Sequence, residues 1–308
     1  MRYLVVGAGA LGGYFGGRLL EAGKDVTFLL RPGRAKTIQA TGLVVKSRFG
    51  DLALTAPPFV LADDIGGPFD VVIVGCKAYD LAETMASFAP AVGPGTAILP
   101  LLNGMRHLDE LTRRFGAERV LGGLCLISAT LDDAGAVRHL NDLHTLVFGE
   151  LDGTPSARVD AIRDDFADTQ FDGRASNEIV LEMWEKWVFI ASAAGITCLM
   201  RATIGQIVAG GGAGFGVALL DECRAIAAAN GFAPRPPAIE RARAMLTAAG
   251  SPISASMLKD IERGGPVEAD HVLGDLIAHD RSEPSGVSLL RVAYAHLKAY
   301  EARRARSG

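Results

Sequence analysis

The sequence predicts an α/β protein in which a domain built on a parallel sheet is followed by an all-helical domain. Apolar, β-prone runs that end at glycine turns recur as far as about Arg174, and apolar residues at helical spacing follow beyond it. We therefore expect residues 1–174 to form the first domain and residues 175–308 the second. The chain has 308 residues, of which 49% are hydrophobic and 21% charged, so it can bury two cores, and a disordered or coiled-coil chain is excluded.

The N-terminal segment has the order strand, glycine loop, helix, strand. Tyr3–Val6 is typical of a strand buried on both faces, and it continues directly into Gly7-Ala8-Gly9-Ala10-Leu11-Gly12. Apolar residues at helical spacing follow as far as Gly23, and Val26–Leu30 is a second strand. In this context G-x-G-x-x-G indicates a Rossmann dinucleotide-binding domain and disfavours a glycine turn without a ligand. Gly7 allows the tight turn, Gly9 leaves room for a pyrophosphate, and Gly12 lets the helix approach the strand.

The residues after the second strand bear on the choice of nucleotide. NAD-binding domains usually place an Asp or Glu there, which accepts hydrogen bonds from the ribose 2′-OH. This chain has no acid from Leu29 to Arg34 and carries Arg31 and Arg34 instead. Guanidinium groups suit a 2′-phosphate, so we expect NADP(H), with two solvated surface arginines as the alternative.

Two further strands bring polar side chains to the expected cofactor edge. Val71–Val74 is followed by Gly75-Cys76-Lys77, and Ala97–Leu102 ends at Asn103. Ligands of such sheets bind beyond the carboxyl ends of the strands, so we expect Lys77 and Asn103 at the rim of the cofactor. An exposed lysine and a turn asparagine are the alternatives. The next predicted strands are expected to complete the same sheet; they are Leu124–Thr130, Ala136–His139 and Thr145–Gly149.

The second half of the chain has the apolar spacing of helices. A glycine run, Gly210–Gly216, separates two of them, and since no strand precedes it we expect a flexible connection and not a second phosphate loop. The expected helices are Glu178–Ala194, Val217–Asn230, Ala238–Ala249, His271–His279 and Val287–Arg303.

Composition also excludes several classes of function. The net charge of −4 offers no basic domain for nucleic acid, and no apolar run reaches the roughly 18 residues of a membrane span. The 4 cysteines lie far apart in apolar surroundings, which is typical of reduced thiols in the cytoplasm. The 6 histidines show no metal-ligand spacing, so we expect no metal site.

Over nearly its whole length the chain resembles the ketopantoate reductase (2-dehydropantoate 2-reductase) family. The resemblance implies NADPH-dependent reduction of a 2-keto acid, with ketopantoate as the default substrate and pantothenate biosynthesis as the pathway. Helical domains of this kind often pair, which leaves a homodimer open. The matching segments are Gly7–Gly12, Arg31, Gly75-Cys76-Lys77-Ala78-Tyr79, Leu102-Asn103-Gly104, Glu185-Lys186-Trp187, and Ser256-Met257-Leu258-Lys259-Asp260 with Glu268.

The resemblance also implies roles for particular side chains. Lys186 corresponds to the acid for the carbonyl oxygen, and Glu268 to the carboxylate that holds the substrate hydroxyl. Ser256 corresponds to a substrate contact, and Asn103 to a residue near the nicotinamide that also binds substrate. Lys77, Asn103 and Glu268 are accordingly expected against the cofactor. On the residues alone, Lys186 would be an ordinary lysine of an amphipathic helix.

The chain departs from the family pattern on the helix that carries Lys186. Four and eight residues further on, where the family has asparagines, it has Ile190 and Ala194. Losing two amide groups weakens recognition of a polar substrate. Three hypotheses follow: a ketopantoate reductase, a related oxidoreductase for a less polar keto or hydroxy acid, and a non-catalytic NADP-binding sensor. A complete lysine–glutamate pair disfavours the sensor.

Overall fold

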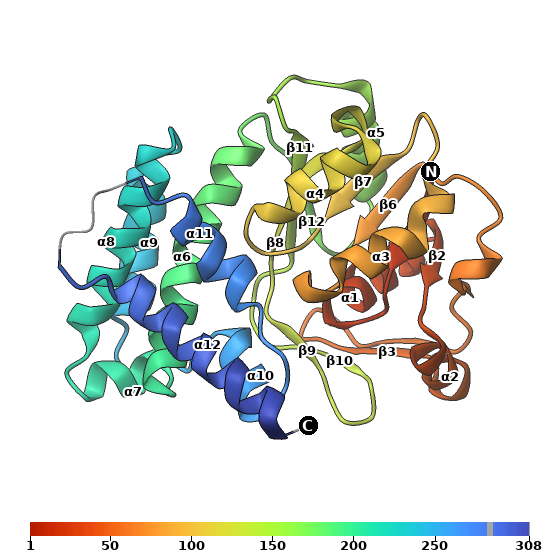
Figure 1. The fold of residues 1–308 in the computed structure, drawn as a ribbon. Helices are drawn as coiled ribbons and strands as arrows, with labels where there is room; N and C mark the ends of the chain where they lie inside the picture. The colour runs from red at the N-terminus through yellow and green to blue at the C-terminus, as the bar shows by residue number, and fades with distance from the viewer. Residues whose placement is uncertain (282–285, 308) are drawn as a thin grey trace. The chain divides into compact units, whose positions relative to one another are not determined.

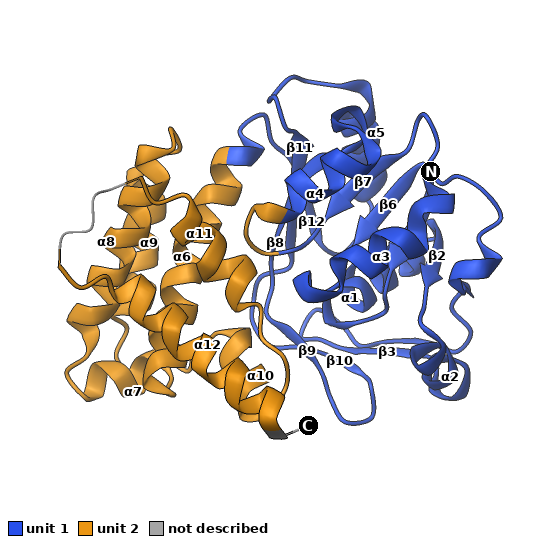
Figure 2. Cartoon of the chain, viewed as in Figure 1, with its two compact units in different colours: residues 1–102, 107–180 blue, residues 103–106, 181–308 orange. Residues whose placement is uncertain are grey.

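The fold was obtained as a computed structural model that describes residues 1–281 and 286–307 (Figure 1). The chain divides into two compact units (Figure 2). Unit 1 consists of Met1–Leu102 and His107–Val180, and unit 2 of Asn103–Arg106 and Leu181–Gly308. Assigning cofactor binding to residues 1–174 and substrate binding to residues 175–308 is a functional division and stays a prediction.

Unit 1 is organised around a parallel sheet with strand order β5-β2-β1-β6-β7 (Figure 1). Along the chain, β2 and β5 are added on one side of β1, and β6 and β7 are then added on the other side. The topological switch point therefore lies between β1 and β6. β1 and β6 pair in parallel from Tyr3↔Val71 to Val6↔Val74. The strands are β1 (Arg2–Val6), β2 (Asp25–Leu29), β5 (Phe59–Val60), β6 (Val71–Val74) and β7 (Ala97–Pro100).

Continuous apolar runs explain why these strands lie in the centre of unit 1. Every residue of Val71–Val74 is buried, as is every residue of Ala97–Pro100. Strands covered on both faces need no polar alternation. The helices that follow strands β1, β2, β6 and β7 are α1 (Ala10–Glu21), α2 (Pro32–Thr41), α3 (Leu81–Phe88) and α4 (Arg106–Phe115).

Helix α1 is packed between two sheets, which explains its unusual glycine content. A Cβ on Gly16 would come within 2.7 Å of the Phe28 ring on β2, and one on Gly17 within 3.2 Å of Leu52 on β4. The second sheet has the order β4-β3-β10-β9. Its strands are β3 (Leu43–Lys46), β4 (Leu52–Leu54), β9 (Ala129–Leu131) and β10 (Val137–His139).

The expectation that strands between residues 124 and 149 complete the parallel sheet is wrong. β9 and β10 belong to the sheet on the far side of α1, whereas β11 pairs with β8 and β12 in a third sheet. The expected strand Leu124–Thr130 is also divided in two. Apolar periodicity shows that a segment is a strand but not which strand it pairs with. The third sheet has β8 (Leu121–Leu126), β11 (Thr145–Glu150) and β12 (Asp172–Ala175), with α5 (Ala157–Phe166) between the last two along the chain.

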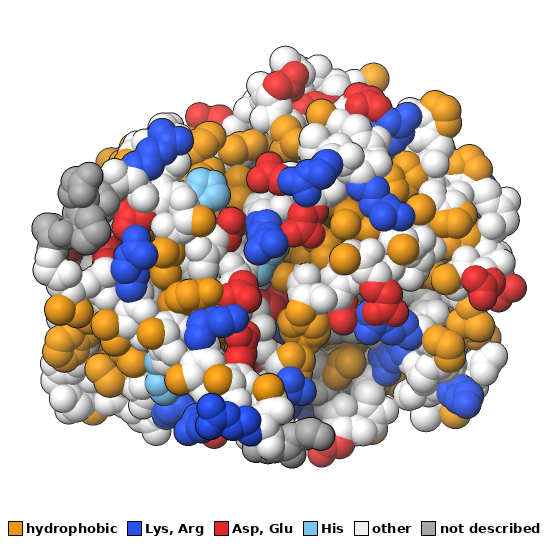
Figure 3. All heavy atoms as spheres, viewed as in Figure 1, with side chains coloured by type: hydrophobic (Ala, Val, Ile, Leu, Met, Phe, Trp, Pro, Cys, Tyr) orange, Lys and Arg blue, Asp and Glu red, His pale blue; other side chains and the backbone are white. Residues whose placement is uncertain are grey.

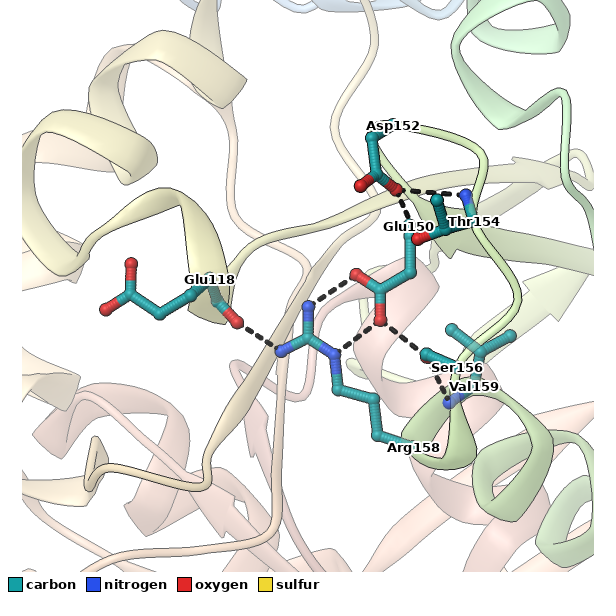
Figure 4. Close-up of polar contacts among 7 residues, drawn as sticks. All are labelled: Glu118, Glu150, Asp152, Thr154, Ser156, Arg158 and Val159. Atoms are coloured by element: carbon teal, nitrogen blue, oxygen red, sulfur yellow. Dashed lines mark hydrogen bonds and ion pairs between the residues drawn. The ribbon is translucent and has the colours of Figure 1, made fainter.

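An ion pair joins the end of β11 to the start of α5 (Figure 4). Arg158 donates from Nε and Nη2 to the two carboxylate oxygens of Glu150 at 2.7 and 2.5 Å. The Ser156 hydroxyl donates to Glu150 at 2.6 Å and accepts the Val159 N–H at 3.2 Å, which caps α5. Burial disfavours the carboxylate, but these hydrogen bonds outweigh it and lower the pKa of Glu150.

Unit 2 is helical throughout the part of the chain that the structure describes, and the expected α/β fold with a helical second half is confirmed. No described helix is long and apolar enough to cross a membrane. The helices are α6 (Ile179–Met200), α7 (Ile204–Ala209), α8 (Ala213–Ala229), α9 (Pro236–Leu246), α10 (Ser256–Glu262), the π-helical turn η5 (Asp270–Gly274), α11 (Asp275–Ala278) and α12 (Leu289–Ser307).

The glycine run of unit 2 differs from the expected flexible connection. Gly210–Gly212 form a hydrogen-bonded turn after α7, in which the Gly212 N–H donates to the Ile207 carbonyl at 2.8 Å. Gly214 and Gly216 lie inside α8. A Cβ on Gly216 would stand 3.6 Å from the Leu246 carbonyl oxygen of α9, an ordinary contact distance, so α8 packs against α9 here without requiring glycine.

Candidate functional site

The Gly7–Gly12 loop joins β1 to α1 through backbone geometry. Gly7 has φ +87°, and its N–H donates to the Leu29 carbonyl of β2 at 2.9 Å. A Cβ on Gly12 would stand 2.1 Å from the Gly7 carbonyl oxygen, so only glycine lets the helix start this close to the loop. Gly75, after β6, is also close: its Cβ would stand 3.3 Å from the Gly12 nitrogen.

At Gly9, unlike Gly7 and Gly12, neither the backbone conformation nor a close contact requires glycine. Its φ is −78°, which any residue adopts, and no described atom lies within 4 Å of where its Cβ would be. The protein itself therefore does not require glycine here. Gly9 is the N-cap of α1 and offers no side-chain cap, and the first turn carries no acid. An open approach to uncapped N–H groups at a helix N-terminus fits the pyrophosphate of a dinucleotide.

Arg31 follows β2, as the sequence predicts, but its guanidinium is paired with acids. Nη1 donates to Asp80 at 3.2 Å and Nη2 donates to Glu83 at 3.1 Å, and the side chain is 58% exposed. The hydrogen bond to Asp80 raises the pKa of Arg31 against the opposing effect of burial. A 2′-phosphate at Arg31 would have to compete with these two carboxylates.

Arg34 lies against the glycine loop. Its Nε donates to the Ala8 carbonyl at 2.9 Å, while Nη2 is buried and has no hydrogen-bond partner among the described residues. Burial lowers the pKa of Arg34. A guanidinium with an unmet donor beside the loop fits an anionic ligand. Sequence reasoning proposed Arg34 for the 2′-phosphate but not its contact with Ala8, which depends on the packing of α2.

Lys77 is half-buried and stands at the start of the short 3-10 helix Ala78–Asp80. Its carbonyl accepts the Asp80 N–H at 3.0 Å. Because Gly75 contacts Gly12, the structure brings this loop close to the N-terminus of α1. The role of Lys77 toward the cofactor stays a prediction.

Asn103 belongs to unit 2 although it follows a strand of unit 1. Asn103–Arg106 group with the helices because Gly104, with φ +77°, lies against His271: its Cβ would stand 2.8 Å from the His271 carbonyl oxygen. Asn103 itself is half-buried. The structure therefore places all four residues of the predicted catalytic and substrate-binding set in one compact unit; they are Asn103, Lys186, Ser256 and Glu268.

Lys186 is half-buried on α6 between the buried rings of Trp184 and Trp187. Its Nζ makes no hydrogen bond or ion pair with any residue that the structure describes. The neighbouring Glu185 is engaged by Arg235, which donates from Nε at 2.7 Å and from Nη2 at 2.6 Å. The ammonium of Lys186 is thus available to a ligand.

Glu268 is 9% exposed and lies two residues before the π-helical turn η5, which begins at Asp270. Its carbonyl accepts the Val272 N–H at 2.9 Å, and the Val272 carbonyl accepts the Trp187 indole N–H at 2.8 Å. Trp187 therefore links α6 beside Lys186 to Val272 of η5, which is in turn hydrogen-bonded to the backbone of Glu268. Burial of a carboxylate is costly and is typical of a functional site.

Ser256 is the exposed first residue of α10. The preceding Ala255 N–H donates at 3.3 Å to the hydroxyl of Thr197, a fully buried residue of α6 that itself donates to the Ala193 carbonyl at 2.6 Å. Thr197 thus positions the start of α10. Sequence reasoning missed this role, because a threonine inside an apolar helix carries no signal of a tertiary partner.

The face of α6 beyond Lys186 is apolar. Residues at i, i+4 and i+8 share one helix face, which here means Lys186, Ile190 and Ala194. Ile190 is half-buried and Ala194 is 2% exposed. A ligand held by Lys186 along this face would contact hydrocarbon and no amide from these two positions.

The parallel sheet with its glycine loop defines a dinucleotide-binding domain of the Rossmann type, carried on one chain with a helical unit, as in pyridine-nucleotide-dependent oxidoreductases. Residues 3–153 match the family described as ketopantoate reductase PanE/ApbA, and residues 178–301 match its C-terminal family. The chain belongs to the ketopantoate reductase family, which includes related oxidoreductases.

Individual relatives agree with this assignment. An uncharacterized oxidoreductase of Bacillus subtilis, YkpB, is 38% identical over 303 residues, which are 98% of this chain and 99% of that one. The 2-dehydropantoate 2-reductase of Geobacter metallireducens has a TM-score of 0.88 at 28% identity, covering 97% and 99% of the two chains. A D-mandelate dehydrogenase bound to NADH and anilino(oxo)acetate shares the fold, with a TM-score of 0.86 at 18% identity over 99% of each chain.

Proposed function

We propose that this protein reduces a 2-keto acid with NADPH, and that its substrate is 2-dehydropantoate, giving pantoate for pantothenate biosynthesis in the cytoplasm. The observation that carries the proposal is Lys186: a half-buried ammonium without a carboxylate partner among the described residues, in one unit with Asn103, Ser256 and the buried Glu268. Family membership supports the same chemistry.

When bound, a reduced nicotinamide would supply the hydride for the carbonyl carbon of the substrate. Negative charge then develops on the carbonyl oxygen, where Lys186 Nζ stabilises it and donates a proton. The Glu268 carboxylate accepts the hydroxyl hydrogen of the substrate, which fixes its orientation. Ser256 is proposed to contact the substrate, and Asn103 to bind substrate near the nicotinamide.

For the cofactor we propose NADPH, bound through the N–H groups at the start of α1 and the basic side chains near the loop. Arg34 supports this choice because of its unmet donor, and Arg31 because it follows β2. Lys77 is proposed to contact the cofactor as well. Fluorescence titration with NADPH and NADH tests the preference. Arg31→Ala should weaken NADPH binding and leave NADH binding nearly unchanged. Arg34→Ala, which also removes the contact with the Ala8 carbonyl of the glycine loop, should weaken NADPH binding more than NADH binding. Equal losses for both nucleotides would contradict a 2′-phosphate contact.

A second candidate, a reductase of less polar keto acids, is favoured by Ile190 and Ala194. A pocket wall without amides gives little to bind the hydroxyl of ketopantoate, and a branched or aromatic side chain would pack on it. The D-mandelate dehydrogenase with the same fold acts on an aromatic hydroxy acid by its name.

One assay separates the candidates. NADPH oxidation is followed with ketopantoate and with a branched and an aromatic 2-keto acid, using the wild type, Lys186→Ala and the exposed-lysine control Lys36→Ala. Turnover of ketopantoate that falls by about 10²- to 10⁴-fold in Lys186→Ala and is kept in Lys36→Ala supports the first candidate.

Higher kcat/KM with an apolar keto acid, again lost in Lys186→Ala, would favour the second candidate. Turnover that survives Lys186→Ala would contradict Lys186 as the proton donor in either candidate function. Tight NADPH binding without any turnover would leave the sensor hypothesis.

A further inference from the structure

A pocket of about 290 Å³ that is open to solvent, here called the cavity, lies in unit 2 where α6 ends, formed by the α6–α7 connection and one side of α10. Pockets for organic ligands usually start near 300 Å³, so its size suits a small metabolite and not a dinucleotide. The charged and polar side chains that line it include Arg201, Thr203, Gln206, Lys259, Glu262 and Arg263.

The lining carries more positive than negative charge. The Glu262 carboxylate is engaged by Arg201, from Nε at 2.8 Å and from Nη2 at 2.7 Å. Within the described residues, the side chains of Lys259 and Arg263 form no ion pair and donate no hydrogen bond. Lys259 lies on α10 and Arg263 is the C-cap residue of the same helix, four residues further on, where like charges repel each other. An anion between them would relieve that repulsion.

Neighbouring groups add to the positive field. Arg304 near the end of α12 donates from Nε to the Gly264 carbonyl at 2.9 Å, which places it directly after Arg263. Burial lowers the pKa of His296, and the cations Arg201 and Arg303 lower it further. Figure 3 shows lysine and arginine side chains gathered at the edge of unit 2 near the end of α12.

Arg201 occupies a backbone position where glycine is usual. It has φ +52°, the left-handed conformation that ends α6, and the next N–H, of Ala202, donates back to the Thr197 carbonyl at 3.2 Å. Glycine or asparagine closes a helix this way with less strain. The backbone of the helix end therefore does not require arginine, and the guanidinium of Arg201 lines the cavity, where it pairs with Glu262.

We propose that this cavity is a binding site for a small anion with at least two negative charges, a phosphate ester or a di- or tricarboxylate. Arg201, whose Nε and Nη2 are held by Glu262, keeps Nη1 for such a group, and Lys259 on α10 and Arg263 directly after it supply further positive charge. The site is distant from Lys186, because Lys186 and Met200 are 14 residues apart on α6, about 21 Å at 1.5 Å per residue. Ser256 of the proposed substrate-binding set lies nearer, at the start of the helix α10 that also carries Lys259.

Calorimetric titration of the full chain tests this site. Inorganic pyrophosphate and citrate are the probes, at constant ionic strength and with NADPH present in excess so that the glycine loop is blocked. We expect saturable binding of at least one probe to one site per chain. Pyrophosphate alone would indicate a phosphate ester as the ligand, and citrate alone a polycarboxylate.

Variants assign the binding to the cavity. Arg201→Gly, which suits φ +52° and is therefore expected to fold, should weaken binding at least tenfold, and so should the double change Lys259→Gln with Arg263→Gln. The controls remove exposed cations outside the cavity, Lys36→Gln and Arg224→Gln, and should leave the affinity unchanged. Absence of saturable binding, or an equal loss in variants and controls, would overturn the proposal.

Discussion

The glycine loop of unit 1 and the polar set of unit 2 are built in different ways. The loop, Gly7–Gly12, is continuous in sequence and acts through backbone N–H groups and the absence of side chains. The polar set is spread from Asn103 to Glu268 and acts through side chains that separate elements hold in place. The comparison teaches that a backbone site is carried by local sequence, whereas a side-chain site depends on contacts between distant segments. Each prediction below alters one of these two properties.

The largest expected effect separates two glycines of the same loop. Gly12→Ala puts a Cβ 2.1 Å from the Gly7 carbonyl oxygen, so we expect a loss of about 3 kcal/mol in the free energy of unfolding. Gly9→Ala meets no described atom within 4 Å and should change stability by less than about 0.5 kcal/mol. Gly9→Ala should nevertheless weaken the affinity for NADPH at least about tenfold, which corresponds to about 1.4 kcal/mol. Urea denaturation and fluorescence titration measure the two quantities; unchanged NADPH affinity in Gly9→Ala would contradict a pyrophosphate at this loop.

Glu268→Gln tests the side-chain site without changing its size. Loss of a charged hydrogen-bond acceptor for the substrate hydroxyl should lower kcat/KM by about 10- to 100-fold. NADPH affinity measured by titration should fall much less if Glu268 mainly serves the substrate. Glu240→Gln, an exposed glutamate on α9 of the same unit, is the matched control. An equal kinetic loss in the control would show that the effect is not specific to the site.

Ile190→Asn restores an amide on the face of α6 that carries Lys186. If this face contacts the substrate, kcat/KM for ketopantoate relative to an apolar 2-keto acid should rise about tenfold. Phe189→Asn is the control, because it alters a half-buried neighbour that points to another side of the helix. The same change of preference in both variants would remove Ile190 from the substrate pocket.

The smallest effect concerns a charge pair outside both sites. Glu150→Gln removes the carboxylate held by Arg158 and should cost about 1 kcal/mol of stability at neutral pH without affecting turnover (Figure 4). The pKa of Glu150 is lowered in the folded state, against the effect of burial, by hydrogen bonds from Arg158 and Ser156.

The lowered pKa determines the direction of the pH dependence. The carboxylate stabilises the fold above its usual pKa of 4.5, and this contribution is lost as the pH falls below that value. The difference between wild type and Glu150→Gln in urea denaturation should therefore shrink from pH 6 to about pH 3. Asp63→Asn, at an exposed acid, serves as the control. A difference that is constant with pH would mean that Glu150 titrates alike in both states.

Much of unit 1 could be predicted from sequence because its signals are local. The buried strand Val71–Val74 was predicted with the bounds that the structure has, and β1, α1 and β2 agree within a residue or two. Which strands pair with one another could not be predicted from these local signals. The strands β8 to β11 have the right character, but their pairing with β3 and β12 depends on contacts that no local pattern encodes.

For the candidate site, the residues could be predicted from the sequence, but their contacts could not. Family motifs supplied the candidates Lys186, Glu268, Ser256 and Asn103, and the structure adds their common membership in unit 2. It also adds what motifs do not contain: the carboxylates around Arg31, the contact of Arg34 with Ala8, and the support of α10 by Thr197. Hydrogen bonds between side chains far apart in sequence require the folded arrangement.

From local sequence alone come the Rossmann loop, the helical second half and the residue types available for chemistry. These follow from short-range properties: the steric freedom of glycine, the burial of continuous apolar strands, and the helical spacing of apolar residues. Tertiary packing determined the rest. It placed Asn103 with the helices of unit 2, gave Arg31 two acidic neighbours, and left Arg34 with an unmet donor. These contacts join residues far apart in sequence, so local sequence does not specify which partners meet.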